Sequence, residues 1–480
     1  MRAFPAIIAI FLVLGVSAQI QVQSVYTNAQ EQFSPQATLT FTSGNAPQGS
    51  VITVDDTVHF QTMAGFGAAL TDSTCYLLSN LNTSTYWTVL NNLFNATSGI
   101  GISYIRLPIS ATDFSLSNYT YDNQPEGQTD PGLQSFSISH DQQYIIPVIQ
   151  NIKEINPKLK IIASPWSPPA WMKNTDSMLG TAPDGTVSNL LEVFYGSYAN
   201  YFVKFIQAYD MQGINIDALT IQNEPLYGPT GYPGLYLDQY AASDFINNHL
   251  AQAFLENDIQ TKLFVYDHNW DREDNPAYVY QNLNDYAKEI VGGAAFHCYA
   301  GDVTNQSVFH NSYPDAHIYQ TECSGGDWSG GFTDTLDSDM KTILIEAINN
   351  WAEVSLKWNI ALDQNKGPQN GGCDTCRGLV TIHTDTGAID YTVDYYSIGI
   401  FSKYVRPGAI RIKVQTNDNN FLATGFVNPD GSKAIMIYNQ DTSSHEFSLS
   451  WNNSWIQTSL PAQTVAAFTW SSSISENIGI

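Results

Sequence analysis

The fold of this chain is decided by one stretch of sequence, Asp217-Ala218-Leu219-Thr220-Ile221-Gln222-Asn223-Glu224-Pro225. Ala218–Gln222 is uncharged and mostly apolar or β-branched, which predicts a buried parallel strand. Pro225 ends the strand because it has no amide hydrogen to donate. Catalytic groups in α/β folds collect at the carboxyl ends of strands, so Glu224 is a candidate acid or base and Asn223 a candidate ligand for a substrate hydroxyl. On this stretch alone, the alternative that these residues only open a polar loop stays open.

Apolar runs of this kind alternate with helical patterns through the middle of the chain. Eight strands are predicted, at Met63–Leu70, Ser103–Ile109, Lys160–Pro165, Ala218–Gln222, Leu263–Asp267, Ala294–Tyr299, His317–Thr321 and Val354–Leu362. Helical segments between them include Asp141–Ile155, Leu190–Asp210, Leu237–Asn257, Asn275–Glu289 and Asp339–Ala352. This α/β pattern predicts a (β/α)8 TIM barrel. An open doubly wound sheet is the competing arrangement, but no Gly-rich phosphate-binding loop follows any of these strands, so a nucleotide site has no support.

Both ends of the chain have a different pattern. From Gln19 to about Phe60, and again after about Pro407, short alternating runs separated by turn residues predict strands. Two β-rich ends therefore enclose the α/β segment.

The first residues have the organisation of a secretory signal. Met1-Arg2 precedes the apolar run Ala6–Val13, and Val16-Ser17-Ala18 predicts cleavage before Gln19, so residues 1–18 are expected to be a signal peptide. No later run of eighteen apolar residues occurs, and we expect a secreted, extracellular protein without a transmembrane segment. Five sequons fit a glycoprotein from a eukaryotic host: Asn82, Asn95, Asn118, Asn305 and Asn452.

The composition excludes several classes of partner. The chain has 480 residues, of which 43% are hydrophobic, enough for one large domain and a smaller one. Acidic residues outnumber basic residues 45 to 19, and the net charge of −26 opposes binding to nucleic acids and to anionic lipid surfaces. We therefore expect a neutral substrate and a monomeric protein.

Five cysteines are present, and Cys373 and Cys376 form the closely spaced pair. A zinc half-site or a redox pair is one interpretation, but no second Cys-x-x-Cys or clustered histidine pair accompanies it. A small loop disulfide is favoured in an exported chain. The odd total leaves at least one thiol unpaired or intermolecular, and we expect a buried, inert thiol.

Polar and aromatic residues follow the predicted strands one after another. They include Arg106, Asp113, Trp166, Asn223, Glu224, Asp267, His268, His297, Tyr299, Glu322 and Trp358. Carboxylates, aromatic rings, amides and imidazoles suit sugar hydrolysis, in which two acids flank the bond and aromatic faces receive the sugar rings. Glu224 and Glu322 can face each other, about 5 to 5.5 Å apart in a retaining mechanism or about 6.5 to 9.5 Å in an inverting one. No three-ligand metal spacing occurs, and neither a metal nor a cofactor is expected.

Several of these residues also have a purely structural interpretation. Arg106 can be a buried partner of a barrel carboxylate, and Trp166 can belong to the core. His268 and His297 can be hydrogen-bonded core histidines. Asp267 is an alternative acid to the glutamate pair. The functional interpretation rests on the recurrence of polar residues at the ends of all eight strands.

Seven motifs occur in order along the predicted barrel: Phe66-Gly67-Ala68-Ala69-Leu70-Thr71-Asp72, Ile105-Arg106-Leu107-Pro108, Ala163-Ser164-Pro165-Trp166-Ser167-Pro168-Pro169-Ala170-Trp171-Met172-Lys173, Gln222-Asn223-Glu224-Pro225, Phe296-His297-Cys298-Tyr299, Thr321-Glu322-Cys323 and Trp358-Asn359-Ile360-Ala361-Leu362. Together they resemble the conserved blocks of glycoside hydrolase family 30, which contains glucosylceramidases, endo-β-1,6-glucanases, β-1,6-galactanases and xylanases. The resemblance runs from about Phe60 to Leu362 and extends weakly into both ends.

The resemblance implies a catalytic (β/α)8 barrel at residues 61–404 and an all-β, sandwich-like side domain built from both chain ends, residues 19–60 and 405–480. It implies a retaining mechanism in which Glu322 is the nucleophile and Glu224, the acid/base, holds a proton until the leaving group departs. Substrate-binding or supporting positions are Arg106, Asp113, Trp166, Asn223, Tyr299 and Trp358, and His297 joins them by its place at a strand end.

The loops favour a secreted endo-β-1,6-glucanase that acts on a neutral β-linked glucan. Gln222 before the Asn-Glu-Pro motif and the Gly371–Cys376 loop look more like that branch than like the glucosylceramidases. Glucosylceramidase and β-1,6-galactanase are the alternatives, since the aromatic-rich loop Leu226–Tyr240 can supply an apolar mouth for lipid chains. A non-catalytic carbohydrate-binding protein is opposed by the presence of both glutamates.

Overall fold

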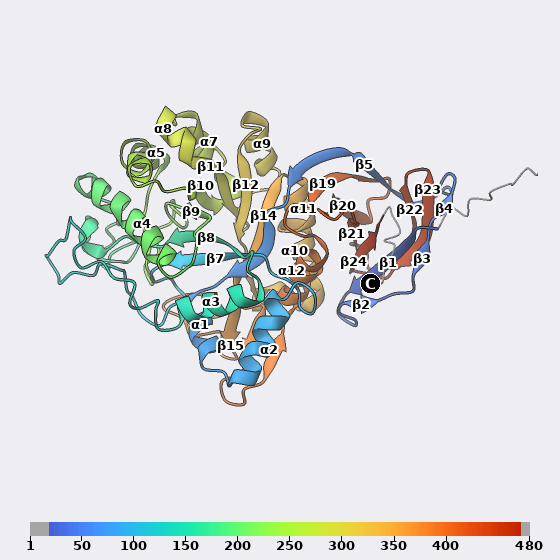
Figure 1. Ribbon diagram of the computed structural model, residues 1–480, viewed down its shortest axis with the longest axis horizontal. Helices are drawn as coiled ribbons and strands as arrows, with labels where there is room; N and C mark the ends of the chain where they lie inside the picture. The colour runs from blue at the N-terminus through green and yellow to red at the C-terminus, as the bar shows by residue number, and fades with distance from the viewer. Residues whose placement is uncertain (1–18, 472–480) are drawn as a thin grey trace, which may run out of the picture.

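The computed structural model describes residues 19–471, and the expected signal peptide at residues 1–18 lies outside the described residues. A barrel surrounded by helices occupies one end of the molecule, and a β-rich side domain lies against it (Figure 1). Between residues 19 and 471, no helix is both long enough and apolar enough to cross a membrane.

Eight parallel strands close the barrel in the order β10-β11-β12-β14-β6-β7-β8-β9. Their bounds are Gly65–Ala69 (β6), Tyr104–Ile109 (β7), Lys160–Pro165 (β8), Ala218–Thr220 (β9), Lys262–Asn269 (β10), Val291–His297 (β11), His317–Glu322 (β12) and Ala352–Asn359 (β14). Both faces of these strands are covered, so every residue of β7, for example, is buried. The prediction of a TIM barrel is confirmed.

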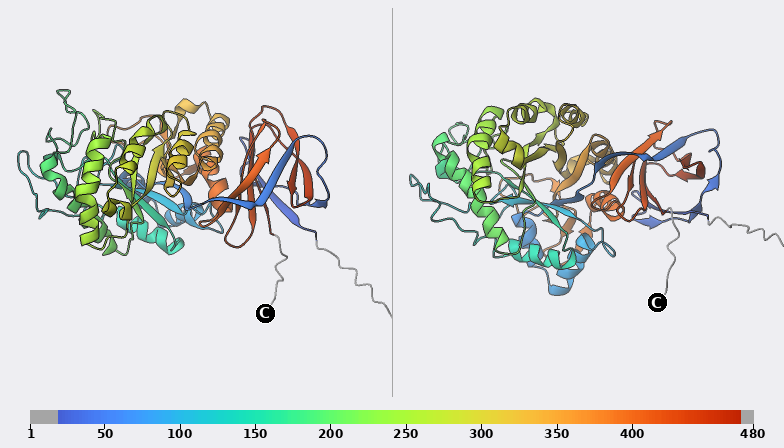
Figure 2. Two further views of the ribbon diagram at one scale, coloured as in Figure 1. Left: turned by 90° about the horizontal axis from the view of Figure 1, so that it is seen from above. Right: turned by 45° about the horizontal axis from the view of Figure 1, so that its top comes forward.

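Helices surround the barrel (Figure 2). They are α1 (Asp72–Ser79), α2 (Thr83–Phe94), α3 (Ile145–Ile155), α4 (Tyr195–Asp210), α5 (Gln239–Phe245), α6 (Ala251–Glu256), α7 (Asp274–Gln281), α8 (Asp285–Ile290), α9 (Asn305–Ser312), α10 (Phe332–Thr342), α11 (Ile345–Asn349) and α12 (Val393–Tyr404). Helix α4 shows why they pack on the strands: Tyr198, Phe202, Phe205 and Tyr209 recur at helical spacing and are all fully buried.

The structure divides several elements that the sequence predicts as continuous, and the helix predicted at Asp339–Ala352 falls partly in α10 and partly in α11. The helix predicted at Asn275–Glu289 is two helices, α7 and α8, because the side chain of Asn284 caps α8 and accepts a hydrogen bond from the Ala287 amide at 2.9 Å. The strand predicted at Val354–Leu362 is divided into β14 and β15 (Ala361–Asp363). Short sheets beyond the barrel are formed by β15 with β17 (Val380–Ile382) and β18 (Ile389–Tyr391), and by β13 (Gly325–Gly326) with β16 (Cys376–Arg377).

The side domain takes strands from both chain ends into one sheet, as predicted. Its strands are β1 (Gln21–Thr27), β2 (Ser34–Pro35), β3 (Leu39–Thr40), β4 (Thr42–Ser43), β5 (Val51–Thr62), β19 (Ile410–Thr416), β20 (Phe421–Val427), β21 (Lys433–Asn439), β22 (His445–Trp451), β23 (Ser454–Leu460) and β24 (Thr464–Trp470). Strand β5 pairs antiparallel with β19 and parallel with β22, so a segment from the beginning of the chain lies between two segments from its end.

Strand β21 shows how the side domain is attached to the barrel. Ala434, Met436 and Tyr438 belong to the large core that includes the barrel helices. Ile435 and Ile437, which point to the other face, belong to the separate core of the side domain. Because successive side chains of a strand alternate between faces, one strand serves both cores and joins the domains.

Candidate active site

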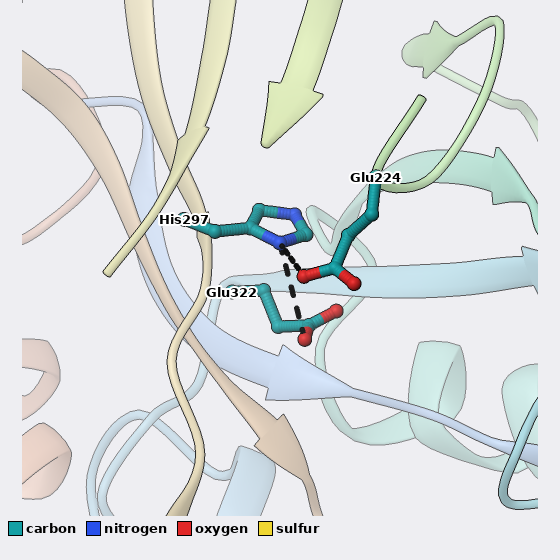
Figure 3. A group of neighbouring side chains, drawn as sticks. All are labelled: Glu224, His297 and Glu322. Carbon is teal, nitrogen blue, oxygen red and sulfur yellow. Dashed lines mark hydrogen bonds and ion pairs between the residues drawn. The ribbon is translucent and has the colours of Figure 1, made fainter. Parts of the chain in front are cut away.

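Two glutamates face each other at the carboxyl ends of barrel strands (Figure 3). Glu322 is the last residue of β12, and Glu224 lies four residues beyond the end of β9. One carboxylate oxygen of each and a ring nitrogen of His297 all lie within 4.8 Å of one another. This separation favours a retaining hydrolysis, with carboxyl groups about 5 to 5.5 Å apart, over an inverting one, which leaves about 6.5 to 9.5 Å for a water molecule.

The backbone holds Glu224 in a conformation that is rare for a residue other than glycine. Its φ is 46°, in the left-handed region. Its amide donates a hydrogen bond to the Asp267 carbonyl at 3.0 Å, and its carbonyl accepts one from the Tyr227 amide at 2.9 Å. Such conformations persist where the surrounding structure enforces them, and they cluster at functional sites. Strand β9 is shorter than the predicted strand Ala218–Gln222, and the chain turns here to present Glu224 to the mouth.

Arg106 joins three polar side chains of the site. Its fully buried guanidinium donates from Nη1 to Glu322 at 2.5 Å and from Nη2 to Asn223 at 2.7 Å and Asp267 at 2.8 Å. A guanidinium with two carboxylate partners stays charged, so it places a fixed positive charge against Glu322. Arg106 is thus a buried partner of a barrel carboxylate. It also contacts Glu322 and Asn223, which lie at the ends of the two strands that carry the candidate catalytic glutamates.

Trp166 and Trp358 form a stacked pair beside this guanidinium. Their ring centroids are 5.2 Å apart, and Cζ of Arg106 lies 4.8 Å from the ring of Trp166 and 5.5 Å from that of Trp358. Both indoles are buried, and Tyr232, which the sequence did not single out, packs against the same cluster. The pair therefore supports Arg106 through cation–π contacts.

His297 is hydrogen-bonded at both ring nitrogens. Nδ1 lies 3.2 Å from Glu224, and Nε2 lies 3.0 Å from Asp267. Burial lowers the pKa of His297, but the charge of Glu322 and the contacts with Asp267 and Glu224 outweigh it and raise the pKa to about 9. Burial raises the pKa of Glu224, yet its hydrogen bond to His297 and the nearby positive charges bring it below the ordinary value. The pair in the free enzyme is therefore imidazolium and carboxylate, and the proton expected on Glu224 rests on His297.

Tyr299 binds the other oxygen of the second glutamate. Its hydroxyl donates to Oε1 of Glu322 at 2.9 Å and accepts a hydrogen bond from the Ser324 amide at 3.0 Å. Burial of the hydroxyl and the charges of Glu322 and Glu224 raise the pKa of Tyr299 well above its ordinary value, so the phenol stays a donor. With Arg106 on Oε2, each carboxylate oxygen of Glu322 receives a hydrogen bond.

Asp113, which the sequence also singled out, lies in the loop after β7. Burial and the charges of Glu322 and Glu224 raise the pKa of Asp113 well above its ordinary value. Its backbone carbonyl accepts a hydrogen bond from the Asn370 amide at 2.7 Å, which ties it to a neighbouring loop. A protonated carboxyl group at this place can donate a hydrogen bond to a sugar hydroxyl.

Models of known protein families match most of the chain. The glycosyl hydrolase family 30 TIM-barrel domain matches residues 63–405, and the glycosyl hydrolase family 30 beta sandwich domain matches residues 408–468. The chain belongs to glycoside hydrolase family 30. It is an O-glycosyl hydrolase of a family whose mechanism is typically retaining, and the predicted resemblance is confirmed.

Relatives named for two different activities align with most of this family 30 chain. An endo-1,6-beta-D-glucanase of Aspergillus fumigatus is 35% identical over 411 residues, which cover 81% of this chain and 81% of the relative. The lysosomal acid glucosylceramidase of Mus musculus is 28% identical over 446 residues, which cover 88% of this chain and 84% of the relative. The solved structure of an endo-beta1,6-glucanase matches with a TM-score of 0.84 at 31% identity, covering 95% of this chain and all of that chain (100%).

The family 30 site is anchored by Asp267, which the sequence predicted only as an alternative acid. Asp267 is fully buried and accepts hydrogen bonds from Arg106 and His297. It also accepts hydrogen bonds of 2.6 to 2.8 Å from the hydroxyls of Ser164, Thr220 and Thr321. Burial raises the pKa of Asp267, but Arg106 and His297 outweigh it and hold the pKa well below the usual range. Asp267 therefore fits a fixed anchor behind the glutamates better than an alternative catalytic acid.

Among residues 19–471, Glu224, His297 and Glu322 also have a spacing that a metal ion could use. The electrostatic surroundings oppose a cation at this place. Arg106 already lies against Glu322, and His297 carries a proton below about pH 9. We therefore interpret Glu224 and His297 as a pair that transfers protons, with Glu322 beside them held by Arg106.

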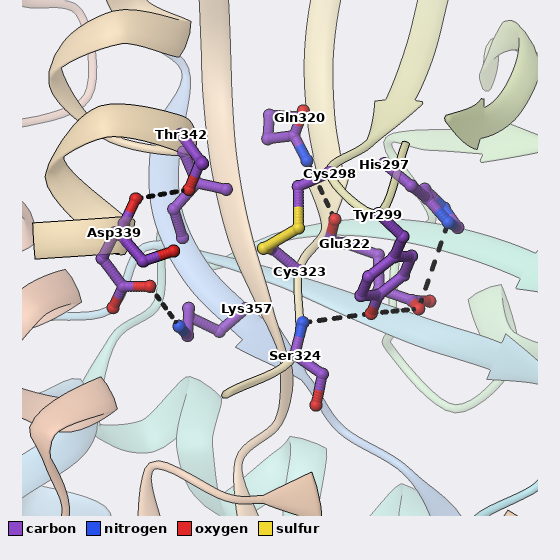
Figure 4. The surroundings of a disulfide bond; sticks show 12 residues. His297, Cys298, Tyr299, Gln320, Glu322, Cys323, Ser324, Asp339, Thr342 and Lys357 are labelled. Carbon is purple, nitrogen blue, oxygen red and sulfur yellow. Dashed lines mark hydrogen bonds and ion pairs between the residues drawn. A yellow bond between two sulfur atoms is a disulfide. The ribbon is translucent and has the colours of Figure 1, made fainter. Parts of the chain in front are cut away.

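Two disulfides lie near the mouth of the family 30 barrel. Cys298–Cys323 joins the loops that follow β11 and β12 (Figure 4). Cys373 and Cys376 form the loop disulfide that their spacing predicts. Cys75 is free and buried, and burial raises the pKa of its thiol well above the ordinary value, which makes it inert. The pairing of Cys298 with Cys323 has no signal in the sequence, because no motif links residues on two different strands.

Proposed function

We propose that this protein is a secreted endo-β-1,6-glucanase that cleaves neutral β-glucan by double displacement. The choice of substrate is supported by the higher identity to endo-1,6-β-glucanases than to the lysosomal glucosylceramidase. The chemistry is supported by one geometric observation: one carboxylate oxygen of Glu224 and one of Glu322 lie within 4.8 Å of each other.

In the first step, Glu322 attacks the anomeric carbon while Glu224 gives a proton to the departing glycosidic oxygen. The hydrogen bonds from Arg106 and Tyr299 fix the orientation of the attacking carboxylate before the substrate arrives. The glycosidic bond breaks, and the sugar is held as an ester on Glu322.

The proton of this step comes from the pair of Glu224 and His297. In the free enzyme the proton is on the imidazole, 3.2 Å from the carboxylate. When a glycosidic oxygen contacts Glu224, the imidazole passes its proton along this hydrogen bond to the carboxylate. Glu224 then gives the proton to the glycosidic oxygen. In the second step Glu224 takes a proton from a water molecule, which attacks the anomeric carbon and releases Glu322.

Exposed aromatic side chains in the loops after the strands suit a glucan. Tyr227, Tyr299 and Trp328 follow β9, β11 and β12 and are 50%, 45% and 57% exposed. Such rings stack on sugars while their polar atoms stay in water. Glucosylceramidase is the second candidate, because a glucosylceramidase matches over most of the chain.

We also propose that the protein is exported and glycosylated. The signal-like residues 1–18 support export, and so do two disulfides, which persist in oxidising compartments. Among the sequons, Asn82, Asn118 and Asn452 are exposed, whereas the Asn305 amide donates to the Trp270 carbonyl at 2.9 Å. Protein recovered from the medium should begin at Gln19 and lose mass with peptide N-glycosidase. Retention of residues 1–18 would contradict cleavage.

Product analysis on four substrates tests the proposed activity. Pustulan (a β-1,6-glucan), β-1,6-galactan, xylan and glucosylceramide are incubated with the enzyme in parallel, with Glu322→Gln as the control for contaminating activity. We expect gentio-oligosaccharides from pustulan, released as the β-anomer because the mechanism is retaining. Glucose released from glucosylceramide alone would overturn the choice of substrate, and cleavage of galactan alone would assign the galactanase.

A further inference from the structure

A covalent bond lies one residue beyond the last paired residues of two barrel strands. Strands β11 and β12 pair in parallel as far as His297 and Glu322. Cys298 and Cys323 are the next residues, and they form a disulfide with a Cα–Cα distance of 5.4 Å (Figure 4). The disulfide therefore continues the pairing of the two strands at the point where the ladder ends.

The register of the two strands is irregular at this point. A shift falls between Phe296 and His297, so that His297 pairs with Glu322. Neighbouring residues of a strand point to opposite faces, and a slip by one residue would turn Glu322 away from the mouth. Irregularities of this kind redirect side chains beside active sites. The bond between Cys298 and Cys323 prevents such a slip, because it fixes which residues lie opposite each other.

The residues after the two cysteines hold the nucleophile. Tyr299 accepts a hydrogen bond from the Ser324 amide and donates one to Glu322. Tyr299 is 45% exposed, so packing restrains this residue only on part of its surface. The carbonyl of Cys323 also accepts a hydrogen bond from the Trp358 amide at 3.1 Å. The disulfide thus constrains both backbone segments that orient Glu322.

We propose that the Cys298–Cys323 disulfide is a positioning element that aims Glu322 through Tyr299. The inference rests on the proposed function, in which Glu322 is the nucleophile. With the disulfide intact, the hydrogen bond between Tyr299 and Glu322 is preorganised. Without it, the loop after β11 gains conformational freedom, which has to be lost again before each reaction.

Removal of the bond tests the proposal. Cys298→Ser/Cys323→Ser is compared with Cys75→Ala, which replaces a buried cysteine outside the site. We expect kcat on pustulan to fall about 10- to 100-fold in the double variant, the scale of a displacement of about 1 Å, and to stay at the wild-type value in the control. Activity is measured at a temperature at which thermal unfolding shows every variant to be folded, because a disulfide between residues 25 positions apart also stabilises the fold.

A double-mutant cycle with Tyr299→Phe separates positioning from stability. If the disulfide acts through the Tyr299 hydroxyl, removing both costs little more kcat than Tyr299→Phe alone. Additive losses would overturn the path through Tyr299, and a lower Tm with unchanged kcat would overturn the proposal. Glu322→Gln distinguishes failure of the proposed function from failure of the positioning role. If that variant is active, the proposed function fails, and if it is inactive while the disulfide variant is fully active, only the positioning role fails.

Discussion

The Nδ1 atom of His297 lies 3.2 Å from the Oε1 atom of Glu224, and this contact determines where the leaving-group proton rests in the free enzyme. The pKa of His297 is raised to about 9, whereas that of Glu224 is below its ordinary value. Because the two groups are in contact, the pair titrates as a unit. Glu224 can therefore act as an acid without a raised pKa of its own, because the proton is one hydrogen bond away.

Replacing His297 by Asn should remove a pH-dependent part of the stability. The pKa of His297 is raised from 6.5 to about 9 by folding, so its contribution is complete below pH 6.5 and is lost as the pH rises through about 9. A shift of this size corresponds to about 3 kcal/mol. Urea unfolding at pH values on both sides of this window measures the free energy of unfolding. The difference between the wild type and His297→Asn should shrink by about that amount as the pH rises. Stability curves that stay parallel would contradict the assignment.

The two glutamates should respond differently to the leaving group. Glu224→Gln should lower kcat on pustulan by about 10²- to 10⁴-fold, because proton transfer is lost. The rate of the first step on a dinitrophenyl β-glucoside should suffer less, since that leaving group needs no proton. Glu322→Gln should abolish turnover of both substrates, because no ester can form. Burst kinetics and steady-state rates on the two substrates measure the difference.

An exposed carboxylate serves as the control for this pair. Glu256→Gln, at the end of α6, should leave both rates unchanged because the side chain is exposed and outside the site. Added azide should restore turnover of the activated glucoside by Glu224→Gln, because it replaces water without needing a base. Near wild-type activity of either catalytic variant on pustulan would be incompatible with the assigned roles.

Arg106 should be needed for both stability and activity. Replacement by Met and replacement by Lys should affect the two to different degrees. Arg106→Met removes the main cation of buried Asp267 and should cost about 3 to 5 kcal/mol of unfolding free energy. Arg106→Lys keeps a charge and should cost less. A single ammonium group, however, cannot replace a guanidinium that binds Glu322, Asn223 and Asp267, so we expect kcat to fall at least about 10²-fold. Urea unfolding and kcat, measured on both variants, check this, and full activity of the lysine variant would refute it.

Lys357 should stabilise the barrel from behind the site. Its Nζ lies 2.7 Å from Asp339 and 2.6 Å from Asp394, and all three side chains are buried. Asp394 keeps Arg377 at 2.6 Å, so Lys357→Met mainly leaves Asp339 uncompensated, at a cost of about 3 to 5 kcal/mol. Adding Asp339→Asn should recover part of the loss, because the uncompensated charge is gone. Urea unfolding that shows no recovery would mean that packing, and not charge, dominates at Lys357.

Local patterns predicted where each barrel strand lies, and they drew attention to the two glutamates. The strand predicted at Lys160–Pro165 coincides with β8, and that at Ser103–Ile109 differs from β7 by one residue. These strands are covered on both faces, so their apolar runs are unbroken and end where the burial ends. Glu322 directly follows its predicted strand, and Glu224 is the second residue after its own, so both mark the carboxyl end of a strand.

By itself, the sequence determined the alternation of strands and helices and the residues that follow each strand. Only the tertiary structure decided that an oxygen of Glu224 and one of Glu322 lie within 4.8 Å, that the pKa of His297 is raised to about 9 and that Cys298 is bonded to Cys323. Arg106 and Glu322 are 216 positions apart in the chain and yet share a hydrogen bond. The physical reason is that such contacts depend on strand order, register and closure of the barrel. A period of two or 3.6 residues reports the burial of one segment and carries no information on which segment lies beside it.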